Sequence, residues 1–344
     1  MLKDVIAQVL VGQDLSQEQA EQAMEVIMSG QAGDVQISSL LTALRMKGET
    51  STEITGFAQT MRNYAAKIQC NSGSLIDTCG TGGDKKGTFN VSTTVAFVVA
   101  GAGLTVAKHG NSGVSSSCGS ADVLTSLGIY INLPPEAVAT MINEINIGFL
   151  YAPSFHKAMK HAAKPRKELG FRTIFNLLGP LTNPANAHCQ LIGVYEPALT
   201  QKIGEALQGL GVRRAMVVHS LDGMDEISTM APTQVTEVKN DIIRSYVINP
   251  ADYGFTGGDP ADYIGGTPEE NAEIIVDILQ GQTGAKRDIV LMNAAAALLV
   301  ADKVENLAEG LKVAAESIDS GAARAKLEAL RSASQRHKEE FLLS

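Results

Sequence analysis

Two glycine-rich segments with polar neighbours give the first chemical signal in this sequence. The segment DTCGTGGD occupies residues 77–84, KHGN occupies residues 108–111, and each follows an apolar run. Glycine permits positive φ and lets backbone N–H groups approach an anion without a Cβ in the way. Lysine, serine, threonine and asparagine side chains nearby would supply further donors. The pair of segments therefore predicts a phosphate-binding floor.

The first segment alone does not identify a ligand. Its glycines match neither GxxxxGKS nor GxGxxG, so a tight turn between a strand and a helix explains them equally well. The phosphate interpretation gains support from Asp84 at the end of the loop. It also gains from Asn90, Ser92 and Thr93, which can cap a helix and donate to phosphate together, and Ser92 can reach a cation as well.

The second segment places a cation at the end of an expected strand. Lys108 is either a solvated side chain or a point charge for phosphate, and the serines that follow at 115–117 and 120 would extend the cradle. His109 is less informative, because a lone histidine is often a packing or turn residue. The neighbouring glycine loop favours the phosphate role for Lys108.

A pair of carboxylates follows the expected strand at residues 215–219. Asp225 and Glu226 lie in the loop DGMDE, where solvated loop carboxylates are the simpler explanation. Beside two candidate phosphate loops, however, adjacent carboxylates suit Mg²⁺, a hard cation that is usually shared with substrate phosphates. We therefore expect Mg²⁺ as the cofactor.

A basic helix is expected at residues 154–169, with Pro165 as the point at which it can break. It carries five of the chain's cations, at positions 157, 160, 164, 166 and 167. Such a run is usually a solvated face, or it can hold an acidic substrate. We choose Arg166 for that second role, because a guanidinium can grip a planar carboxylate through two hydrogen bonds.

The elements that must position these residues change type along the chain. Up to about residue 69 apolar residues recur at helical spacing, with an S-x-x-Q capping box at Ser16 and Gln19 and a helix stop at Gly30. After residue 74 short apolar runs alternate with glycine loops and helices, which predicts an α/β domain with a mostly parallel sheet. Ligands bind such sheets at the carboxyl ends of strands. The expected strands span residues 75–77, 95–100, 104–107, 187–194, 215–219 and 235–238, and further helices are expected at 131–147 and 268–342.

Composition excludes several classes of protein. The chain has 344 residues and a net charge of −9, which argues against general binding to nucleic acid or to anionic membranes. The first residues lack the features of a signal peptide and no stretch reaches the apolar length of a membrane span, so we expect a cytoplasmic location and no membrane partner. The four cysteines show no metal-ligand or disulfide spacing.

Six segments in order closely resemble the anthranilate phosphoribosyltransferases, and the likeness runs through the whole chain. They are DTCGTGGD at 77–84, TFNVST at 88–93, KHGN at 108–111, GSADVL at 119–124, RTIFNLLGPLTNP at 172–184 and DEIS at 225–228. The resemblance implies transfer of the 5-phosphoribosyl group from phosphoribosyl pyrophosphate (PRPP) to the amine of anthranilate, with release of pyrophosphate, in tryptophan biosynthesis. It also implies a Mg²⁺-dependent homodimer.

The resemblance further implies a fold of the nucleoside phosphorylase and phosphoribosyltransferase type. A small helical domain at residues 1–70, completed by helices from about 154–186, would hinge on an α/β domain at 71–344. By motif position, the residues that would hold PRPP are Gly80, Gly83, Asp84, Thr88, Asn90, Val91, Ser92, Thr93, Lys108, Gly110, Asn111, Ser112, Gly113, Val114, Ser115, Ser116 and Ser120. The metal would contact Ser92, Asp225 and Glu226, and anthranilate would contact Gly80, His109, Asn111 and Arg166.

The implied reaction asks little of an acid or a base. The arylamine is neutral near pH 7, so the barrier lies in breaking the bond to pyrophosphate as an oxocarbenium-like centre develops. We therefore expect no covalent nucleophile. The chain departs from the family where basic residues commonly follow KHGN and the paired serines, because it has Ser112 and Ser117 there. Lys85 and Lys86 are the cations that can compensate.

Two other functions compete with this interpretation. A nucleoside phosphorylase of related fold would also use a hinge and an anion pocket, but it does not call for KHGN or for the Asp225 and Glu226 pair. A non-catalytic binder of polyanions would use the basic helix, and the presence of candidate Mg²⁺ ligands counts against it.

Overall fold

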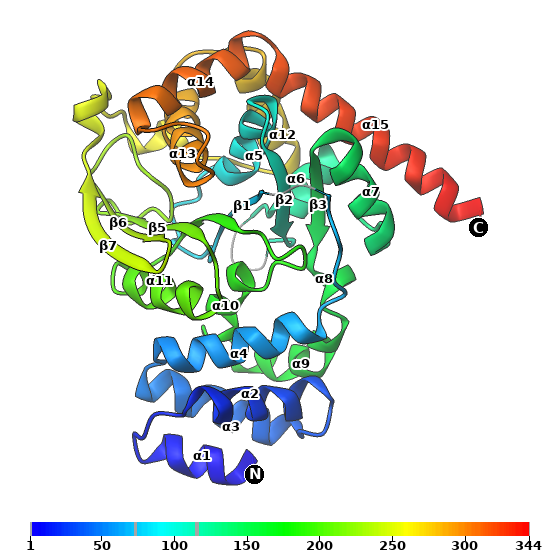
Figure 1. Ribbon diagram of the computed structural model, residues 1–344, viewed down its shortest axis with the longest axis vertical. Coiled ribbons are helices and arrows are strands. Elements are labelled where there is room, and N and C mark those ends of the chain that lie inside the picture. The colour runs from blue at the N-terminus through cyan, green and yellow to red at the C-terminus, as the bar shows by residue number, and fades with distance from the viewer. Residues whose placement is uncertain (1, 72–73, 114–116, 344) are drawn as a thin grey trace.

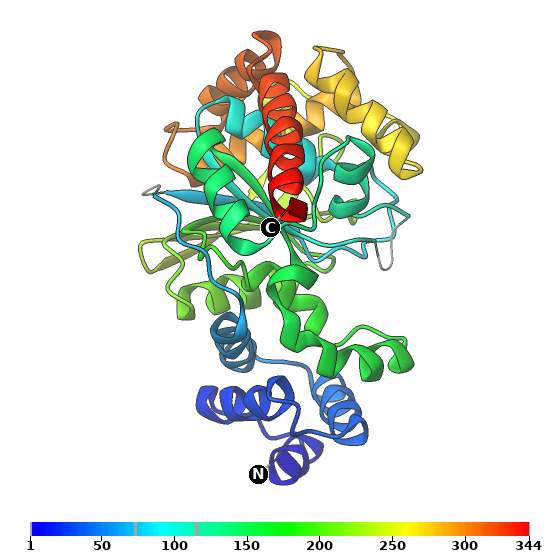
Figure 2. The same cartoon turned by 90° about the vertical axis from the view of Figure 1, so that its right-hand side faces the viewer.

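The computed structural model describes residues 2–71, 74–113 and 117–343 and has two parts of unequal size (Figure 1). The smaller part lies at one end of the long axis, where Figure 2 shows its helices as a separate layer. It contains α1 (Leu2–Leu10), α2 (Gln17–Met28), α3 (Asp34–Lys47) and α4 (Ser51–Tyr64). The predicted capping box is confirmed, because Ser16 and Gln19 close the start of α2 reciprocally.

A buried carboxylate joins three elements of this helical part. Glu53 is fully buried and accepts hydrogen bonds from the backbone N–H groups of Leu15 and Thr50, at 2.9 and 2.8 Å. The ammonium of Lys47, at the end of α3, lies 2.9 Å from the same carboxylate. A buried charge is tolerated only when its hydrogen bonds are satisfied, and Glu53 therefore fixes how α3 and α4 meet the loop before α2.

The larger part is built on one seven-stranded sheet. Its strands are β1 (Leu75–Gly80), β2 (Thr105–Gly110), β3 (Ile147–Tyr151), β4 (Cys189–Gly193), β5 (Arg214–Ser220), β6 (Thr233–Lys239) and β7 (Ile242–Ile248). The order is β3-β2-β1-β4-β5-β6-β7, with β1 to β5 parallel and β6 and β7 antiparallel. The predicted α/β class with a mostly parallel sheet is confirmed.

One predicted strand is wrong. Residues 95–100 lie inside α5 (Val91–Gly101), and all of them are buried. A helix that is buried on every side shows an unbroken apolar run, which periodicity cannot distinguish from a buried strand. The predicted strands also did not include β3 and β7.

Helices cover both faces of the sheet. On one face lie α5, α12 (Pro268–Leu279), α13 (Ala285–Val300), α14 (Leu307–Asp319) and α15 (Ala322–Leu343), and on the other lies α11 (Leu199–Gly209). Adjacent strand residues alternate between the two cores. Leu191 and Met216 belong to the core of the first face, whereas Ile192 and Val217 belong to the second core, which continues through α11 into α1 to α4.

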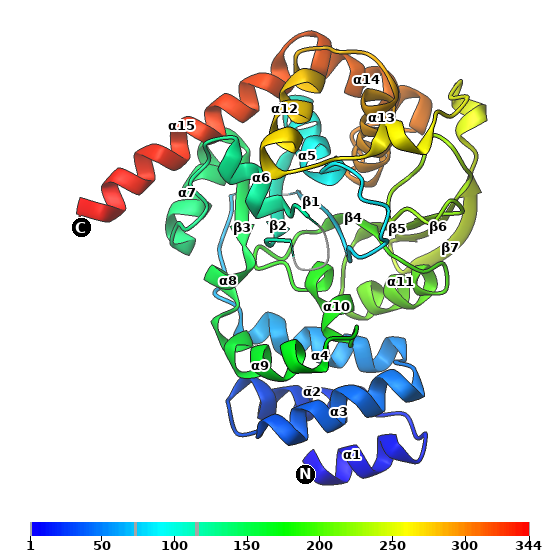
Figure 3. The same cartoon turned by 180° about the vertical axis from the view of Figure 1, so that it is seen from behind.

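Short helices connect the sheet to the helical part. The chain passes from β3 through α8 (Ala152–Phe155), a 3₁₀ turn at Lys157–Met159, α9 (Lys160–Leu169), α10 (Phe175–Leu178) and a 3₁₀ turn at Gly179–Leu181. Figure 3 shows α10 between the sheet and α4, and α9 beside the helices of the smaller part. The expected break at Pro165 is wrong, because α9 runs through Pro165 and the interruption lies near His156.

Further elements complete the larger part. They are α6 (Ser120–Ser126), α7 (Pro135–Ile145) and 3₁₀ turns at Pro250–Tyr253 and Pro260–Tyr263, while α15 projects beyond the sheet (Figure 1). Within the described residues, no helix combines the length and the apolar character needed to cross a bilayer.

Gly56 allows α4 to pack closely on α2. A Cβ at this position would lie 2.5 Å from the Gln17 carbonyl oxygen and 2.8 Å from the Ala20 Cβ. Alanine gains about 1 kcal/mol over glycine in helix propensity, but overpacking costs about 1–3 kcal/mol. We expect Gly56→Ala to lower the melting temperature by a few degrees, measured by circular dichroism. Asn63→Ala, at an exposed position of the same helix, is the control and should not lower it; a higher melting temperature for Gly56→Ala would contradict the close packing.

Candidate active site

Two glycines at neighbouring strand ends make room for the acidic loop. A Cβ on Gly193, at the end of β4, would lie 1.5 Å from the carbonyl oxygen of Asp225. A Cβ on Gly80, at the end of β1, would lie 2.9 Å from the Asp225 carboxylate. The loop after β5 therefore crosses the carboxyl ends of β1 and β4, which brings Asp225 and Glu226 to the first glycine segment as the sequence analysis expected.

The first glycine segment is held open by bonds on both of its sides. Gly82 and Gly83 have positive φ, at 64° and 80°. The Gly82 N–H donates to the Asp225 carboxylate at 3.0 Å, and the Thr81 N–H donates to the Gly193 carbonyl at 2.9 Å. Asp84 accepts from the backbone N–H groups of Lys86 and Asp225 at 3.1 and 3.4 Å.

The N-terminus of α5 lies next to the first glycine segment. Asn90 is the N-cap residue but makes no side-chain cap bond, because its side-chain oxygen accepts the Cys118 thiol at 3.3 Å while its amide donates to the Cys118 carbonyl at 3.4 Å. Helix N-termini favour anions through their free N–H groups and the helix dipole. The predicted residues Val91, Ser92 and Thr93 form the first turn of α5, and the buried Thr93 hydroxyl has no partner among the described residues. Thr88 lies just before, in a single bridge to Ile264.

Lys108 is buried directly beneath this helix N-terminus. Only 3% of its surface is exposed, and its ammonium donates to the Thr78 carbonyl at 2.5 Å and to the Ser92 hydroxyl at 3.3 Å. Burial lowers the pKa of Lys108, while the charges of Asp77, Cys79 and Glu226 raise it. The Lys108 side chain thus lies under the site, in contact with Ser92, a predicted metal ligand.

Asp77 fixes the position of the second glycine segment. Its fully buried carboxylate accepts the His109 N–H at 3.1 Å and the Asn183 side-chain amide at 2.7 Å. The same Asn183 amide also donates to the Ala107 carbonyl at 2.8 Å. Burial raises the pKa of Asp77 to about 6, and Lys108, Asn183 and the His109 N–H oppose that shift.

Three carboxylates crowd together above Lys108. Burial and the charge of Asp84 raise the pKa of Asp225, and burial and the charge of Asp225 raise the pKa of Glu226. Within the described residues no three Asp, Glu, His or Cys side chains are arranged to hold a metal ion by themselves. Two carboxylates and the Ser92 hydroxyl nevertheless fit Mg²⁺, which keeps water and substrate oxygens as its other ligands. A divalent cation would also relieve the repulsion that raises these pKa values.

Side-chain hydrogen bonds from Asn111 and Asp122 hold the backbone of the loop after β2. The Asn111 side chain accepts the Ser112 N–H at 2.8 Å, and Asp122 accepts the N–H groups of Gly113 and Gly119 at 2.7 and 2.8 Å. Gly110 ends β2 close to Ser120, the first residue of α6, and the Ser117 hydroxyl donates to the Gly266 carbonyl at 3.2 Å. The predicted residues Val114, Ser115 and Ser116 lie outside the described residues.

Two neutral histidines lie side by side next to the second segment. The rings of His109 and His156 are 5.1 Å apart, and both residues are buried. Burial lowers the pKa of His109 to about 3 and that of His156 to about 4. The Nδ1 atom of His109 lies 3.2 Å from the Gly179 carbonyl, which can only accept, so Nδ1 carries the proton. The Nε2 atom of His109 is then an acceptor, and the Nε2 atoms of both rings have no partner among the described residues.

Arg166 occupies the inner side of α9. Its guanidinium lies 5.0 Å from the centre of the Phe175 ring, and burial lowers its pKa. The lysines of the same region are exposed, and Lys164 pairs with Asp34 of α3 at 2.8 Å. The basic helix thus combines a solvated face with one inward guanidinium that has no carboxylate partner among the described residues.

Sequence reasoning missed several residues that build this site. Asp77, Arg172 and Asn183 entered only as parts of motifs, and His156 was not singled out. Arg172 donates to the Gly83 carbonyl and stacks on Tyr195, with 3.9 Å from the guanidinium carbon to the ring centre. The signal for Asp77, Arg172 and Asn183 was their place inside the segments 77–84 and 172–184, but their partners are far away in the sequence.

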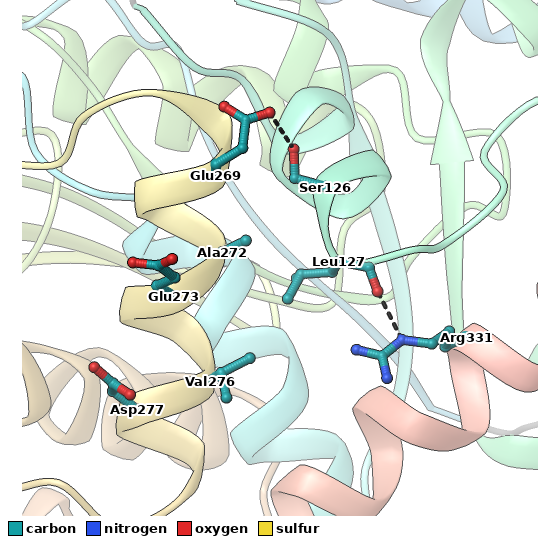
Figure 4. Close-up of a pocket in the computed structure, with 8 residues that line it drawn as sticks. All are labelled: Ser126, Leu127, Glu269, Ala272, Glu273, Val276, Asp277 and Arg331. Carbon is teal, nitrogen blue, oxygen red and sulfur yellow. Dashed lines mark hydrogen bonds between the residues drawn. The ribbon is translucent and has the colours of Figure 1, made fainter.

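A surface cavity of about 340 Å³ contains none of the predicted site residues (Figure 4). Carboxylates of α12 lie along one side of it, and Arg331 of α15 lies on the other, where its Nε atom donates to the Leu127 carbonyl. Its lining is Ser126, Leu127, Glu269, Ala272, Glu273, Val276, Asp277 and Arg331.

Two family descriptions match consecutive parts of the chain. Residues 3–65 match the helical bundle domain of a glycosyl transferase family, and residues 72–324 match the a/b domain of that family. The chain is 53% identical over 340 residues to the anthranilate phosphoribosyltransferase of Symbiobacterium thermophilum, and the match covers 98% of this chain and 99% of that protein.

Solved structures agree with the sequence relatives. The anthranilate phosphoribosyltransferase of Thermus thermophilus superposes with a TM-score of 0.92 at 40% identity, over 96% of this chain and 99% of that one. The Saccharomyces cerevisiae enzyme in complex with PRPP and Mg superposes with a TM-score of 0.89 at 29% identity, over 97% and 98% of the two chains. Another structure of the yeast enzyme holds 4-fluoroanthranilate.

The two buried histidines make stability depend on pH. Their pKa values in the folded state, about 3 and about 4, lie below the unfolded value near 6.5, so the unfolded chain binds more protons between those limits. Stability is therefore lost as the pH falls, by about 2 kcal/mol per histidine between pH 7 and pH 5. We expect His156→Asn to make this loss shallower by that amount in urea unfolding at the two pH values.

The exposed His188 provides the matched control for this experiment. His188→Asn should leave the pH dependence as it is in the wild type. The raised pKa of Asp77 acts in the opposite direction in all three proteins, so it cancels in the comparison. A pH slope for His156→Asn equal to that of the wild type would show that His156 is not held neutral.

Proposed function

Because this chain belongs to the anthranilate phosphoribosyltransferase family, we propose that its two glycine segments hold PRPP and that its α9 side holds anthranilate. The enzyme transfers the 5-phosphoribosyl group from PRPP to the amine of anthranilate, releases pyrophosphate and serves tryptophan biosynthesis. The observation that carries the site assignment is the meeting of the loop at 80–84, the α5 N-terminus and the loop at 225–226 over buried Lys108.

The donor half of the site is suited to stabilise a departing diphosphate. The positive end of the α5 dipole, the amides of the glycine loop and the ammonium of Lys108 would all stabilise negative charge. Ser92, Asp225 and Glu226 would hold Mg²⁺, which when bound neutralises charge on the pyrophosphate oxygens. The remaining predicted residues of 80–93 and 108–120 would line the sugar and phosphate groups. No covalent nucleophile is required.

The acceptor half is suited to a neutral aromatic amine with a carboxylate. Arg166 offers an inward guanidinium for the carboxylate, and its stacking on Phe175 limits its freedom. The Nε2 atom of His109 is an unpaired acceptor among the described residues, which matches an amine that donates N–H. A protonated imidazole could not accept this bond, so the low pKa of His109 serves the role. Gly80 and Asn111 would complete the path between the two halves.

We further propose the assembly and motion that the family resemblance implied. Residues 1–70 together with 154–186 would act as one domain that closes on the α/β domain and excludes water from the reacting centre. Homodimer formation is supported by exposed apolar side chains on the helical part, among them Val35 at 79% and Met46 at 82% exposure. A cytoplasmic location stays a prediction.

One assay tests the activity and the division of the site. Anthranilate, PRPP and Mg²⁺ are mixed with the enzyme, and the loss of anthranilate fluorescence is followed. We expect Arg166→Ala to raise the KM for anthranilate by about tenfold or more, since hydrogen bonds to charged groups contribute about 1.5–3 kcal/mol. The double variant Asp225→Asn with Glu226→Gln should instead raise the Mg²⁺ concentration needed for half-maximal rate.

The control for Arg166→Ala is Lys167→Ala, which removes an exposed cation from the adjacent position of α9. Its KM for anthranilate should match the wild type. An identical response of Arg166→Ala and of the carboxylate double variant to both titrations would show that the two halves are wrongly assigned. A wild-type enzyme that consumes no anthranilate in this mixture would refute the function itself.

Lys85 and Lys86 are exposed beside the donor loop, and the end of the Lys86 side chain reaches Gly223 of the acidic loop. If they replace the missing basic residues near Ser112 and Ser117, Lys85→Ala with Lys86→Ala should raise the KM for PRPP a few-fold at low salt. High salt should shrink the difference, because exposed charges are screened. Lys303→Ala with Lys312→Ala, two exposed lysines elsewhere, is the control; equal KM values for both double variants would rule out the compensation.

A further inference from the structure

Arg172 connects the donor loop to the segment that carries the acceptor site. It lies between α9 and α10, six residues after Arg166 and three residues before Phe175. Its guanidinium donates through Nη2 to the carbonyl of Gly83 and stacks on the ring of Tyr195 at 3.9 Å. Arg172 thus reaches from the α9–α10 connection to the middle of the glycine loop.

The backbone of the glycine loop at Gly83 leaves room for the Arg172 guanidinium. Gly83 has a φ of 80°, and a Cβ there would lie 2.6 Å from Nη2 of Arg172. Any larger residue would therefore displace the guanidinium. Tyr195 is 9% exposed, and its backbone N–H donates to the Thr81 hydroxyl at 3.3 Å. Arg172 and Tyr195 together hold the loop at Thr81 and at Gly83.

The direction of the Gly83 carbonyl determines where the next N–H group points. In a trans peptide the C=O and N–H groups point in opposite directions, so a carbonyl fixed on Arg172 turns the Asp84 N–H to the other side of the loop. One residue before Gly83 in the same loop, the Gly82 N–H donates to the Asp225 carboxylate. Because its carbonyl is engaged by Arg172, the Gly83–Asp84 peptide turns its N–H group away from Arg172 and leaves that donor available to an anion.

We propose that Arg172 is a positioning residue for phosphoribosyl transfer: it orients the Gly83–Asp84 peptide so that the loop offers N–H groups to the pyrophosphate of PRPP, and it couples this loop to the acceptor segment. The inference rests on the proposed assignment of the loop at 80–84 to PRPP. A lysine cannot replace this arginine, because only a planar guanidinium stacks on Tyr195 while it donates to the carbonyl.

The test compares Arg172→Ala and Arg172→Lys with Lys167→Ala, a loss of an exposed cation from the same segment. PRPP binding is measured by calorimetry with Mg²⁺, steady-state KM values are measured for both substrates, and hydrogen exchange is measured for the peptide that spans residues 80–86. We expect both Arg172 variants to weaken PRPP binding about tenfold, as for one lost charge-assisted hydrogen bond, and to exchange faster in that peptide. Lys167→Ala should behave as the wild type in all three measurements.

The outcomes distinguish a failure of the positioning role of Arg172 from a failure of the assignment of the loop at 80–84 to PRPP. Wild-type PRPP binding and exchange in Arg172→Ala, or full recovery in Arg172→Lys, would overturn the positioning role while the wild-type activity stands. A wild-type enzyme that binds no PRPP would overturn both the role and the site assignment. If Arg172→Ala does not fold, as judged by circular dichroism, the Arg172→Lys comparison decides the question, because it keeps the charge and most of the side-chain volume.

Discussion

The buried carboxylate of Asp77 holds the loops of the site in place. A carboxylate with no exposed surface must have hydrogen-bond partners, and this one takes them from His109 and Asn183. One partner belongs to the end of β2 and the other to the segment that enters β4. The carboxylate therefore locks the two segments that flank β1 to each other, and buried Lys108 supports its charge from the same strand as His109.

Close backbone approach explains why the donor half is rich in glycine. Gly80 and Gly193 end adjacent strands, and side chains there would collide with the loop that carries Asp225. The absence of those side chains lets two carboxylates lie beside a loop made for anions. These carboxylates repel phosphate unless a cation lies between them and the phosphate. The crowding of negative charge therefore explains both the raised pKa values of Asp225 and Glu226 and the proposed need for Mg²⁺.

The acceptor half shows how a basic helix in an acidic protein can serve two purposes. The lysines of α9 face solvent, whereas Arg166 points inward onto Phe175 beside a segment that also supplies the carbonyl partner of His109. A general binder of polyanions would keep its cations on the surface. The inward guanidinium and the neutral histidines favour the binding of a small aromatic acid. The relatives of this chain are named anthranilate phosphoribosyltransferases, and anthranilate is such an acid.

Local patterns in the chain were enough to predict the two-part organisation, the α/β class and the loops at the carboxyl ends of strands, because glycine, capping and apolar signals act over a few residues. The ligand roles of individual residues stay predictions. These patterns did not distinguish the buried helix α5 from a strand, and they did not reveal β3 or the partners of Asp77 and Arg172. Those features depend on contacts between residues far apart in the chain, such as Asp77 with Asn183 and Gly83 with Arg172. They become visible only once the chain is folded, since burial and hydrogen-bond direction are properties of the packed molecule and not of any one segment.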